Sequence, residues 1–275
     1  MKDSLPPDQK LAALGSLLRG YGSGLLAFSG GVDSSFLLKA MQMADMKVLA
    51  VTAVSETMPR QDRDAAVSFA GALGSEHLVI HTNELQNESF ARNSADRCFH
   101  CKDELFGRLK AIAAERNIPA VFDGSNHDDL SDYRPGKKAA KDHGIISPLA
   151  ECGMTKEDIR LLSRQLGLQT WDRPSSPCLS SRFPYGTRIT SEALARVGRA
   201  EDSIRALGIR VLRVRDHGET ARIEVKEEDM PVLLAPENRK RIVEGLRALG
   251  YRFVALDLEG YRSGSLNRML QDRIS

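Results

Sequence analysis

The sequence predicts a doubly wound α/β domain with a parallel sheet, followed by a smaller C-terminal α+β domain. Over the first 125 residues, nearly continuous apolar runs alternate with segments of helical periodicity. Such runs are typical of strands that are covered on both faces of a parallel sheet. The first run ends at a glycine–serine turn that leads into a helix, an arrangement that creates an anion site. The 275 residues suffice for one large or two modest domains.

The elements of the first domain follow from these two periodicities. Residues 9–20 have helical spacing, with leucines on one face. Further helices are expected at 36–43, 60–73, 104–116 and 155–166, and strands at 25–28, 47–55, 77–81 and 119–125. The carboxyl ends of parallel strands lie at one edge of a sheet, so we expect Ser29, Thr52 and Gly124 at the edge where such folds bind ligands. Residues 126–148 are polar, and we expect them to be irregular.

A proline-rich loop at 171–187 separates the two predicted domains, which we place at 1–170 and 188–275. A compact domain rarely carries so long a structureless connection unless it is a linker or a functional loop. Beyond it we expect helices at 191–207 and 238–249 and strands at 211–215, 221–225 and 251–258. These elements form a small α+β domain.

Composition limits the classes of function. The formal net charge of +2 is too small to demand a nucleic-acid partner. No apolar run approaches membrane-spanning length, and the residues from Met1 to Pro7 lack the apolar segment of a secretory signal. We therefore expect a cytoplasmic protein without a membrane partner. In that compartment the four cysteines are expected to be thiols, metal ligands or catalysts rather than disulfides.

The stretch A-F-S-G-G-V-D-S-S at 27–35 has the composition of an anion-binding loop. The first-turn amides of a helix lack intrahelical partners, and glycines let the backbone approach phosphate oxygens closely. Ser29, Ser34 and Ser35 add hydroxyl donors. Asp33 would repel phosphate unless a divalent cation such as Mg²⁺ lies between them. The alternative is a plain glycine turn with serine helix caps.

The sequence S-G-G-V-D-S after a strand resembles the pyrophosphate loop of the N-type ATP pyrophosphatases, the PP-loop superfamily. The resemblance implies an adenine nucleotide alpha hydrolase-like domain that cleaves ATP between its α- and β-phosphates and adenylylates a substrate. It implies ATP and Mg²⁺ as cofactors, with Mg²⁺ bound at Asp33. The residues expected to bind the nucleotide are Ala27, Ser29, Gly30, Gly31, Asp33, Ser34, Ser35, Thr52 and Gly124.

Cys178 is the first candidate for covalent chemistry. It lies in the loop 171–187, among serines and close in sequence to Arg182. A guanidinium and several hydroxyls near a thiol lower its pKa and make it nucleophilic. The alternative is an incidental small residue in a hinge. Cysteine is usually a core residue, and this polar, proline-rich setting does not resemble a core, so we favour a functional role.

Cys98 and Cys101 form the sequence C-F-H-C just before the helix expected at 104–116. Two thiols at this spacing can bind one metal ion, act as a redox couple or supply two ligands of an iron–sulfur cluster. With Cys178 as a third ligand, a four-iron cluster would keep one iron open for substrate or sulfide. The alternative is two cysteines at a helix start without such a role. Cys152 has no partner spacing, and we expect it to be structural.

Arg213 and Arg215 alternate along an expected strand, so both point to one face. With Arg222 opposite them across the turn, they could form a phosphate-binding patch, because guanidinium matches phosphate oxygens in a bidentate fork. The alternative is a solvated strand face, which is common for charged residues.

Six stretches together resemble one family of the PP-loop superfamily. They are A-F-S-G-G-V-D-S-S (27–35), D-Y-R-P-G-K-K-A (132–139), S-S-R-F-P-Y-G-T (180–187), L-R-V-R (212–215), A-R-I-E (221–224) and D-L-E-G-Y-R-S-G-S-L-N (257–267). The sequence is similar in these stretches to the LarE sulfur transferases, which help to build the nickel-pincer nucleotide cofactor of lactate racemase. The similarity runs over nearly the whole chain.

The resemblance implies an ATP-dependent sulfurtransferase. ATP would adenylylate a carboxylate of pyridinium-3,5-biscarboxylic acid mononucleotide, and a cysteine thiolate would displace AMP. Cleavage of the carbon–sulfur bond of that cysteine would then leave a thiocarboxylate on the product. Cys178 matches the sulfur-donating cysteine and Glu201 an acidic residue near the same site. Arg182, Arg213 and Arg215 are the expected substrate-binding residues.

The pair Cys98 and Cys101 departs from the single-cysteine pattern of the family. It matches a subgroup in which three cysteines hold a [4Fe-4S] cluster, so the resemblance implies such a cluster on Cys98, Cys101 and Cys178. That route would leave Cys178 intact, and the sequence does not decide between the two routes. The resemblance also implies a homo-oligomer, a hexamer in this family. Two alternatives share the same loop: a PP-loop tRNA thiolase or other adenylylating synthetase, and a non-catalytic nucleotide sensor.

Overall fold

The computed structural model describes residues 5–130 and 135–262, which form two compact units. The first unit comprises Met1–Glu84 and Cys98–Ser176, and the second comprises Leu85–Arg97 and Pro177–Ser275. The division differs from the expected boundaries in two respects. Residues 85–97 group with the second unit, and the loop 171–187 is divided between the two units after Ser176.

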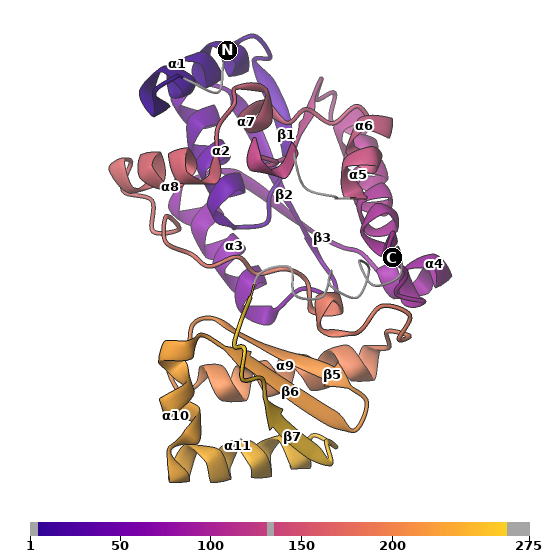
Figure 1. Ribbon diagram of the computed structural model, residues 1–275. Coiled ribbons are helices and arrows are strands. Elements are labelled where there is room, and N and C mark those ends of the chain that lie inside the picture. The colour runs from indigo at the N-terminus through magenta and orange to yellow at the C-terminus, as the bar shows by residue number, and fades with distance from the viewer. Residues whose placement is uncertain (1–4, 131–134, 263–275) are drawn as a thin grey trace, which may run out of the picture. The chain divides into compact units, whose positions relative to one another are not determined.

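The first unit contains a parallel sheet of four strands in the order β3-β2-β1-β4 (Figure 1). The strands are β1 (Ser23–Ala27), β2 (Lys47–Val54), β3 (Glu76–His81) and β4 (Val121–Phe122). Leu25 of β1 is in register with Leu49 on one side and Val121 on the other. The strand order therefore reverses direction between β1 and β4. Ligands of open α/β sheets bind beyond the carboxyl ends of the strands at such a switch point.

Helices cover both faces of this sheet, which confirms the predicted fold class. The helices are α1 (Pro7–Arg19), α2 (Val32–Met43), α3 (Arg60–Ala72), α5 (Arg97–Glu115), α6 (Gly136–Asp142), α7 (Pro148–Glu151) and α8 (Lys156–Gln165), and 3₁₀ turns lie at Glu84–Gln86 and Asp128–Leu130. Leu26 of β1 packs in the core that α1, α2 and α8 share, whereas its neighbour Leu25 packs with α5 and α6. This alternation is the two-residue period of a strand that is buried on both faces.

Three expectations for the first unit need correction. Residues 126–148 are not irregular throughout, because α6 lies within them and buries Ala139 completely against the α5 side of the sheet. Pro135, whose ring fixes φ, directly precedes α6 and favours a helix start. The helix expected at 104–116 begins at Arg97, so Cys98 and Cys101 lie in its first turns. The strand expected at 119–125 is limited to two residues, β4.

The second unit contains a three-stranded mixed sheet with helices, which confirms the expected small α+β domain. Its strands are β5 (Leu212–His217), β6 (Thr220–Val225) and β7 (Phe253–Leu256), and its helices are α4 (Glu88–Ala91), α9 (Ser191–Arg205), α10 (Met230–Leu234) and α11 (Pro236–Ala248), with 3₁₀ turns at Leu179–Arg182 and Glu227–Asp229. β5 and β6 form an antiparallel hairpin, and β7 pairs with β6 in parallel. Gly218 with φ 73° makes the tight turn, so the turn is shorter than the expected four residues.

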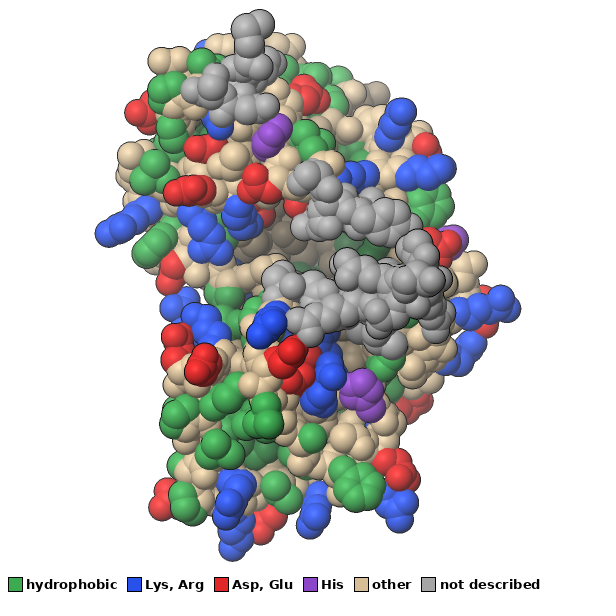
Figure 2. Space-filling model, viewed as in Figure 1, with side chains coloured by type: hydrophobic (Ala, Val, Ile, Leu, Met, Phe, Trp, Pro, Cys, Tyr) green, Lys and Arg blue, Asp and Glu red, His purple; other side chains and the backbone are tan. Residues whose placement is uncertain are grey.

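Two of the motif stretches extend beyond the described residues. Residues 132–134 of the stretch 132–139 and residues 263–267 of the stretch 257–267 lie outside the described ranges. Within the described ranges, the helices are too short or too polar to cross a membrane. On the face in Figure 2, basic and acidic side chains are interspersed on each unit, in accord with the small net charge.

Candidate functional site

The glycine–serine loop joins β1 to α2 at the switch point of the first unit's sheet. Gly30 has a φ of 68°, and a Cβ at this position would lie 2.7 Å from the Cα of Ala66 in α3. Both the left-handed conformation and the close packing therefore require glycine here. Gly31 is the N-cap of α2, so the first-turn amides of that helix open onto the loop. The loop has the backbone of an anion-binding site.

The loop's hydroxyls differ in exposure. Ser29 is exposed, and its Oγ lies 3.1 Å from the Oγ of Ser34 and accepts a hydrogen bond from the N–H of Gly31. Ser35 is fully buried, and its hydroxyl has no hydrogen-bond partner among the described residues. The backbone N–H of Ser35 donates to Gly31. Ser29 is therefore the hydroxyl of the loop that is most open to a ligand.

Asp33, in the first turn of α2, is the acidic group of this loop and has two partners. The Nζ of Lys156, at the start of α8, lies 2.5 Å from Asp33 Oδ2, and Asn126 donates to Oδ1 at 3.3 Å. Gly124 lets β4's end approach this helix, because a Cβ there would lie 3.0 Å from the N of Ser34. Three segments that are distant in sequence thus meet at Asp33.

Sequence reasoning named Gly124 but missed its neighbours Asn126 and Asp128, and it missed Lys156. Asn126 and Asp129 exchange hydrogen bonds of 3.0 and 3.2 Å, and Asp128 accepts the N–H of Lys156 at 2.8 Å. The signal was present in the sequence D-G-S-N-H-D-D at 123–129, a run of polar residues directly after a strand. Its position at the carboxyl edge marks it as part of the same site.

Thr52, an expected nucleotide-binding residue, serves the scaffold with its side chain. Its hydroxyl donates to the carbonyl of Phe28 at 2.8 Å and lies 2.9 Å from Nε2 of His77. The hydroxyl has a single proton, which it donates to Phe28. His77 must therefore be the donor in the hydrogen bond between its Nε2 and the hydroxyl of Thr52. Burial lowers the pKa of His77, which keeps the ring neutral. A role of Thr52 in nucleotide binding stays a prediction.

The cysteines are divided between the units. Cys98, which is exposed, and Cys101, which is half-buried, lie about one turn apart in α5 of the first unit. Cys178 is half-buried and belongs to the second unit, and Cys152 is buried in the core of the first. Within either unit, the described residues contain no group of three His, Cys, Asp or Glu side chains placed to hold a metal ion. Convergence of Cys98, Cys101 and Cys178 stays a prediction.

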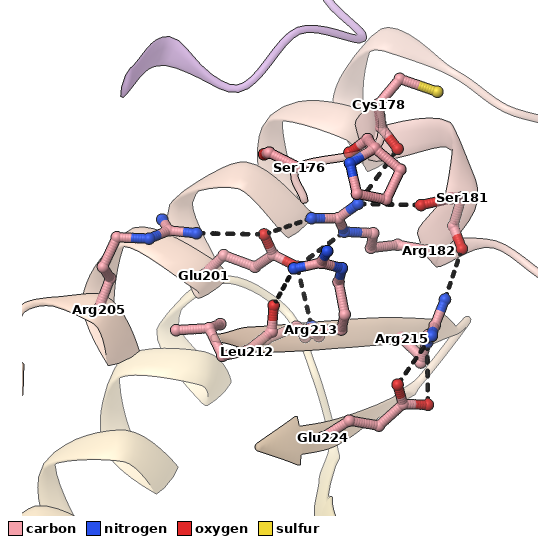
Figure 3. Close-up of polar contacts among 12 residues, drawn as sticks. Ser176, Cys178, Ser181, Arg182, Glu201, Arg205, Leu212, Arg213, Arg215 and Glu224 are labelled. Carbon is pink, nitrogen blue, oxygen red and sulfur yellow. Dashed lines mark hydrogen bonds and ion pairs between the residues drawn. The ribbon is translucent and has the colours of Figure 1, made fainter. Parts of the chain in front are cut away.

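In the second unit, Arg182 and Glu201 form a buried ion pair beside the Cys178 loop (Figure 3). Nε and one terminal nitrogen of Arg182 donate to the two oxygens of Glu201 at 2.8 and 2.9 Å. The other terminal nitrogen donates to the carbonyl of Pro177 at 2.7 Å and to that of Cys178 at 3.2 Å. Arg182 therefore fixes the backbone on which Cys178 is carried.

Arg213 and Arg215 are both buried, which is contrary to a solvated strand face. Arg215 forms a bidentate pair with Glu224 at 2.9 and 2.7 Å and donates to the carbonyl of Ser181 at 2.7 Å (Figure 3). Arg222 lies directly opposite Arg215 in the hairpin and also donates to Glu224. Arg213 donates to the carbonyl of Leu212 and lies 5.0 Å from the ring centre of Tyr261.

Burial and the charges of this cluster together perturb two pKa values. Burial alone would raise the pKa of Glu201, but the hydrogen bonds and charge of Arg182 outweigh burial, and the pKa is lowered. Glu201 is therefore ionised and acts as an acceptor. Burial, followed by repulsion from Arg182, lowers the pKa of Arg213 to about 10. An added negative charge would therefore stabilise the charged form of Arg213.

The stretch 180–187 is held by the segment 85–97. Asn93, which has a φ of 56°, donates from its side chain to the carbonyl of Pro184 at 2.8 Å and accepts the N–H of Gly186 at 2.9 Å. Arg97, the residue before Cys98, bonds Asn93 and lies 5.3 Å from the ring centre of Tyr185. The chain entering Cys98 and the loop after Cys178 are thus bound to each other within the second unit.

The parallel sheet with this glycine–serine loop at its switch point defines a protein of the PP-loop class. No protein-family model matches the chain. It is 44% identical over 247 residues to an uncharacterized protein of Synechocystis, covering 90% of this chain and 92% of the relative. It is 38% identical over 263 residues to the pyridinium-3,5-bisthiocarboxylic acid mononucleotide synthase of Lactiplantibacillus plantarum, covering 95% of each chain.

A third relative, an uncharacterized protein of Methanocaldococcus jannaschii, is 27% identical over 239 residues, covering 87% of this chain and 90% of the relative. The similarity to the Lactiplantibacillus synthase extends over both units. The chain belongs to the family of that synthase, the LarE sulfur transferases. The family that the six motif stretches predicted is thereby confirmed, and the chain is an enzyme.

Proposed function

We propose that the chain is an ATP-dependent sulfur transferase that converts pyridinium-3,5-biscarboxylic acid mononucleotide to the bisthiocarboxylic acid mononucleotide. The observation that carries the proposal is the 38% identity, over 95% of each chain, to a synthase named for that product. Two features of the structure support it. They are the anion-binding loop of the first unit and the buried arginine cluster of the second.

ATP and Mg²⁺ fit the residues of the first unit. The ammonium of Lys156 already binds Asp33 at 2.5 Å, so this position accepts a cation next to the glycine–serine loop at 29–35, which we call the phosphate loop. Carboxylate oxygens are suitable Mg²⁺ ligands, and Asp33 offers them. Asn126 presents its amide N–H to Asp33, while its oxygen accepts the N–H of Asp129. Ser29 and the amides at the start of α2 would hold the phosphates. Bound Mg²⁺ would neutralise phosphate charge and orient the triphosphate.

The chain's own residues would carry the sulfur chemistry as follows. A substrate carboxylate attacks the α-phosphorus of ATP, and pyrophosphate leaves. The Cys178 thiolate attacks the acyl carbon, a carbon–sulfur bond forms, and AMP leaves with the bonding electrons. In the sacrificial route the α-proton of Cys178 is removed and its Cβ–S bond breaks, which leaves a thiocarboxylate on the product and dehydroalanine in the chain. Arg182 holds the carbonyls of Pro177 and Cys178 and so orients the attacking residue.

The mononucleotide's phosphate would bind at the arginine cluster of Arg182, Arg213 and Arg215. These three buried guanidiniums face two buried carboxylates, Glu201 and Glu224. Among these five groups the positive charges outnumber the negative ones, and repulsion from Arg182 adds to the burial that lowers the pKa of Arg213. A phosphate would balance this charge and accept a bidentate pair. Glu201 would act by holding Arg182 in place.

The second route uses a [4Fe-4S] cluster on Cys98, Cys101 and Cys178. Its support is the spacing of Cys98 and Cys101 about one helical turn apart and the attachment of the chain before Cys98 to the loop after Cys178 through Arg97 and Tyr185. Three cysteine ligands would leave one iron open to bind free sulfide, which would be transferred to the adenylylated carboxylate as AMP leaves. We also propose a homo-oligomer, as the family resemblance implies, which light scattering during size-exclusion chromatography tests.

Pyrophosphate release tests the proposal. ATP, Mg²⁺ and the biscarboxylic acid mononucleotide should give pyrophosphate, AMP and a thiocarboxylate product that mass spectrometry detects. Asp33→Asn should lower the rate roughly ten- to a hundredfold, the effect of losing one charged contact, with an unchanged circular dichroism spectrum. Unchanged turnover in a folded Asp33→Asn protein would refute the assignment of the loop. Absence of product with the intact protein would refute the proposed function.

A further inference from the structure

The segment from Trp171 to Ser176 leads from α8 toward Cys178 and is tied to the phosphate loop of the first unit. One terminal nitrogen of Arg173 donates to the carbonyl of Gly30 at 2.9 Å, and the other donates to Asp62 at 2.7 Å. Ser176 donates to the second oxygen of Asp62 at 2.6 Å. Asp62 is 7% exposed and lies in the first turn of α3, so its carboxylate is fixed by the helix.

A second set of contacts holds the same segment against α8. Arg160 donates to the carbonyl of Trp171 at 3.1 Å and to that of Arg173 at 2.9 Å. The guanidinium of Arg164 lies 5.1 Å from the ring centre of Trp171. The hydrogen bonds from α8 therefore hold the backbone of Arg173 in place. This limits the positions from which its side chain can contact Gly30 and Asp62.

The contact with Gly30 also bears on the anion site itself. In a trans peptide the C=O of one residue and the N–H of the next point in opposite directions. Arg173 holds the carbonyl of Gly30, and the N–H of Gly31 is then directed to the other side, where it meets the hydroxyl of Ser29. That N–H is one of the donors that would meet a phosphate. Arg173 thus orients a phosphate-binding amide and holds the chain that leads to Cys178.

We infer that Asp62 and Arg173 are positioning residues that couple nucleotide binding at the phosphate loop to the placement of Cys178. Ser176 precedes Cys178 by two residues, so the contacts of Asp62 fix the point from which the cysteine loop starts. Phosphate in the loop attracts the guanidinium of Arg173 and strengthens its contact with Gly30. Nucleotide therefore holds the cysteine loop more firmly. The inference rests on the proposed ATP site.

Alkylation of Cys178 by iodoacetamide, followed by peptide mass spectrometry, measures this coupling. The nucleotide is α,β-methylene-ATP with Mg²⁺, which cannot be cleaved between its α- and β-phosphates. We expect it to slow alkylation of Cys178 in the unaltered protein. In Asp62→Asn, alkylation without nucleotide should be faster by roughly tenfold, the effect of losing a charged contact, and nucleotide should no longer slow it. Alkylation of Cys152 in the same digest reports any general loosening of the fold.

Asp64→Asn is the matched control, because Asp64 lies two residues away in α3 and pairs with Arg63 at the surface. Asp64→Asn should leave the alkylation rate of Cys178 unchanged, both with and without nucleotide. Ser176→Ala removes one contact of Asp62 at an exposed position. It should also raise the alkylation rate of Cys178 without nucleotide, but by less than Asp62→Asn does. Should Asp62→Asn fail to fold, Ser176→Ala carries the test.

Calorimetric titration of the nucleotide separates the two possible failures. A protein that does not bind the nucleotide contradicts the proposed ATP site. A protein that binds it while the alkylation rate of Cys178 stays the same contradicts the coupling. The coupling is also contradicted if the nucleotide slows alkylation of Cys178 equally in the unaltered protein and in folded Asp62→Asn or Ser176→Ala.

Discussion

The ammonium of Lys156 lies 2.5 Å from the carboxylate of Asp33, although 123 residues separate the two in sequence. The contact places a positive charge beside the first turn of α2, next to the glycine–serine loop. A nucleotide carrying Mg²⁺ would compete for the same carboxylate, because the metal is the stronger partner for its oxygens. Lys156 would then move to the phosphates, for which an ammonium is a suitable partner. Under the proposed function, the carboxylate of Asp33 would thus exchange the ammonium for Mg²⁺ when the nucleotide binds.

Lys156→Met should weaken ATP binding in the presence of Mg²⁺ by roughly tenfold, because one charged contact to the phosphates is lost. Calorimetric titration measures the effect. Lys240→Met, at an exposed position of α11, should leave the affinity unchanged. An affinity that stays the same in folded Lys156→Met would mean that this lysine only neutralises Asp33.

The conformation of the glycine–serine loop was predictable from the sequence because its determinants are local. A glycine that must have positive φ, hydroxyls and a helix start stand next to one another at 29–35. Lys156 and Asn126 were not predicted, because nothing near them in the sequence identifies Asp33 as a partner. Arg173 is a similar case, because nothing in the sequence around this arginine indicates its hydrogen bond to the carbonyl of Gly30.

The second unit shows the same limit. The alternation of Arg213 and Arg215 predicted that both side chains lie on one face of the strand. Their burial was not predicted, because it depends on Glu224 and on chain packing that no local pattern encodes. The segment 85–97 joins this unit through Asn93, whose partners lie some ninety residues later. Helix and strand periods predict elements, whereas such long-range polar contacts decide which elements belong together.

The stability of the protein should depend on the ionisation of Glu201 at acid pH. The pKa of Glu201 is lowered in the folded chain from its usual 4.5, so its contribution is fully present above that pH and is lost as the pH falls through the folded value. Thermal unfolding followed by circular dichroism between pH 7 and 3 measures this loss. Below about pH 4.5, Glu201→Gln should reduce the slope of the free energy of unfolding against pH by up to about 1.4 kcal/mol per pH unit.

The exposed Glu237 in the first turn of α11 provides the control for this experiment. Glu237→Gln should leave the slope nearly as it is in the unaltered chain. An identical slope in the Glu201→Gln variant would show that the pair of Glu201 and Arg182 does not govern acid unfolding.

Arg213→Ala should weaken binding of the mononucleotide substrate by roughly ten- to a hundredfold, because a charged contact to its phosphate is removed. ATP affinity should change little, since the phosphate loop belongs to the other unit. Titrations of each ligand separately test this. Arg252→Ala, at an exposed position that pairs with Glu219, is the control. Equal losses for ATP and substrate would contradict separate sites.

The last prediction concerns the route of sulfur transfer. We expect anaerobically prepared protein to contain iron and sulfide held by Cys98, Cys101 and Cys178, and Cys98→Ala to lose most of the iron, because two remaining thiolates hold a four-iron cluster poorly. Cys152→Ala should keep the iron, since Cys152 is buried among apolar side chains of the first unit. Mass spectrometry after turnover separates the two routes. Loss of about 34 Da at Cys178, the mass of hydrogen sulfide, marks the sacrificial route, and an unchanged mass with several turnovers marks the cluster route. If Cys98→Ala retains both its iron and repeated turnover, the cluster is not held by these cysteines, and the pair in α5 has another role.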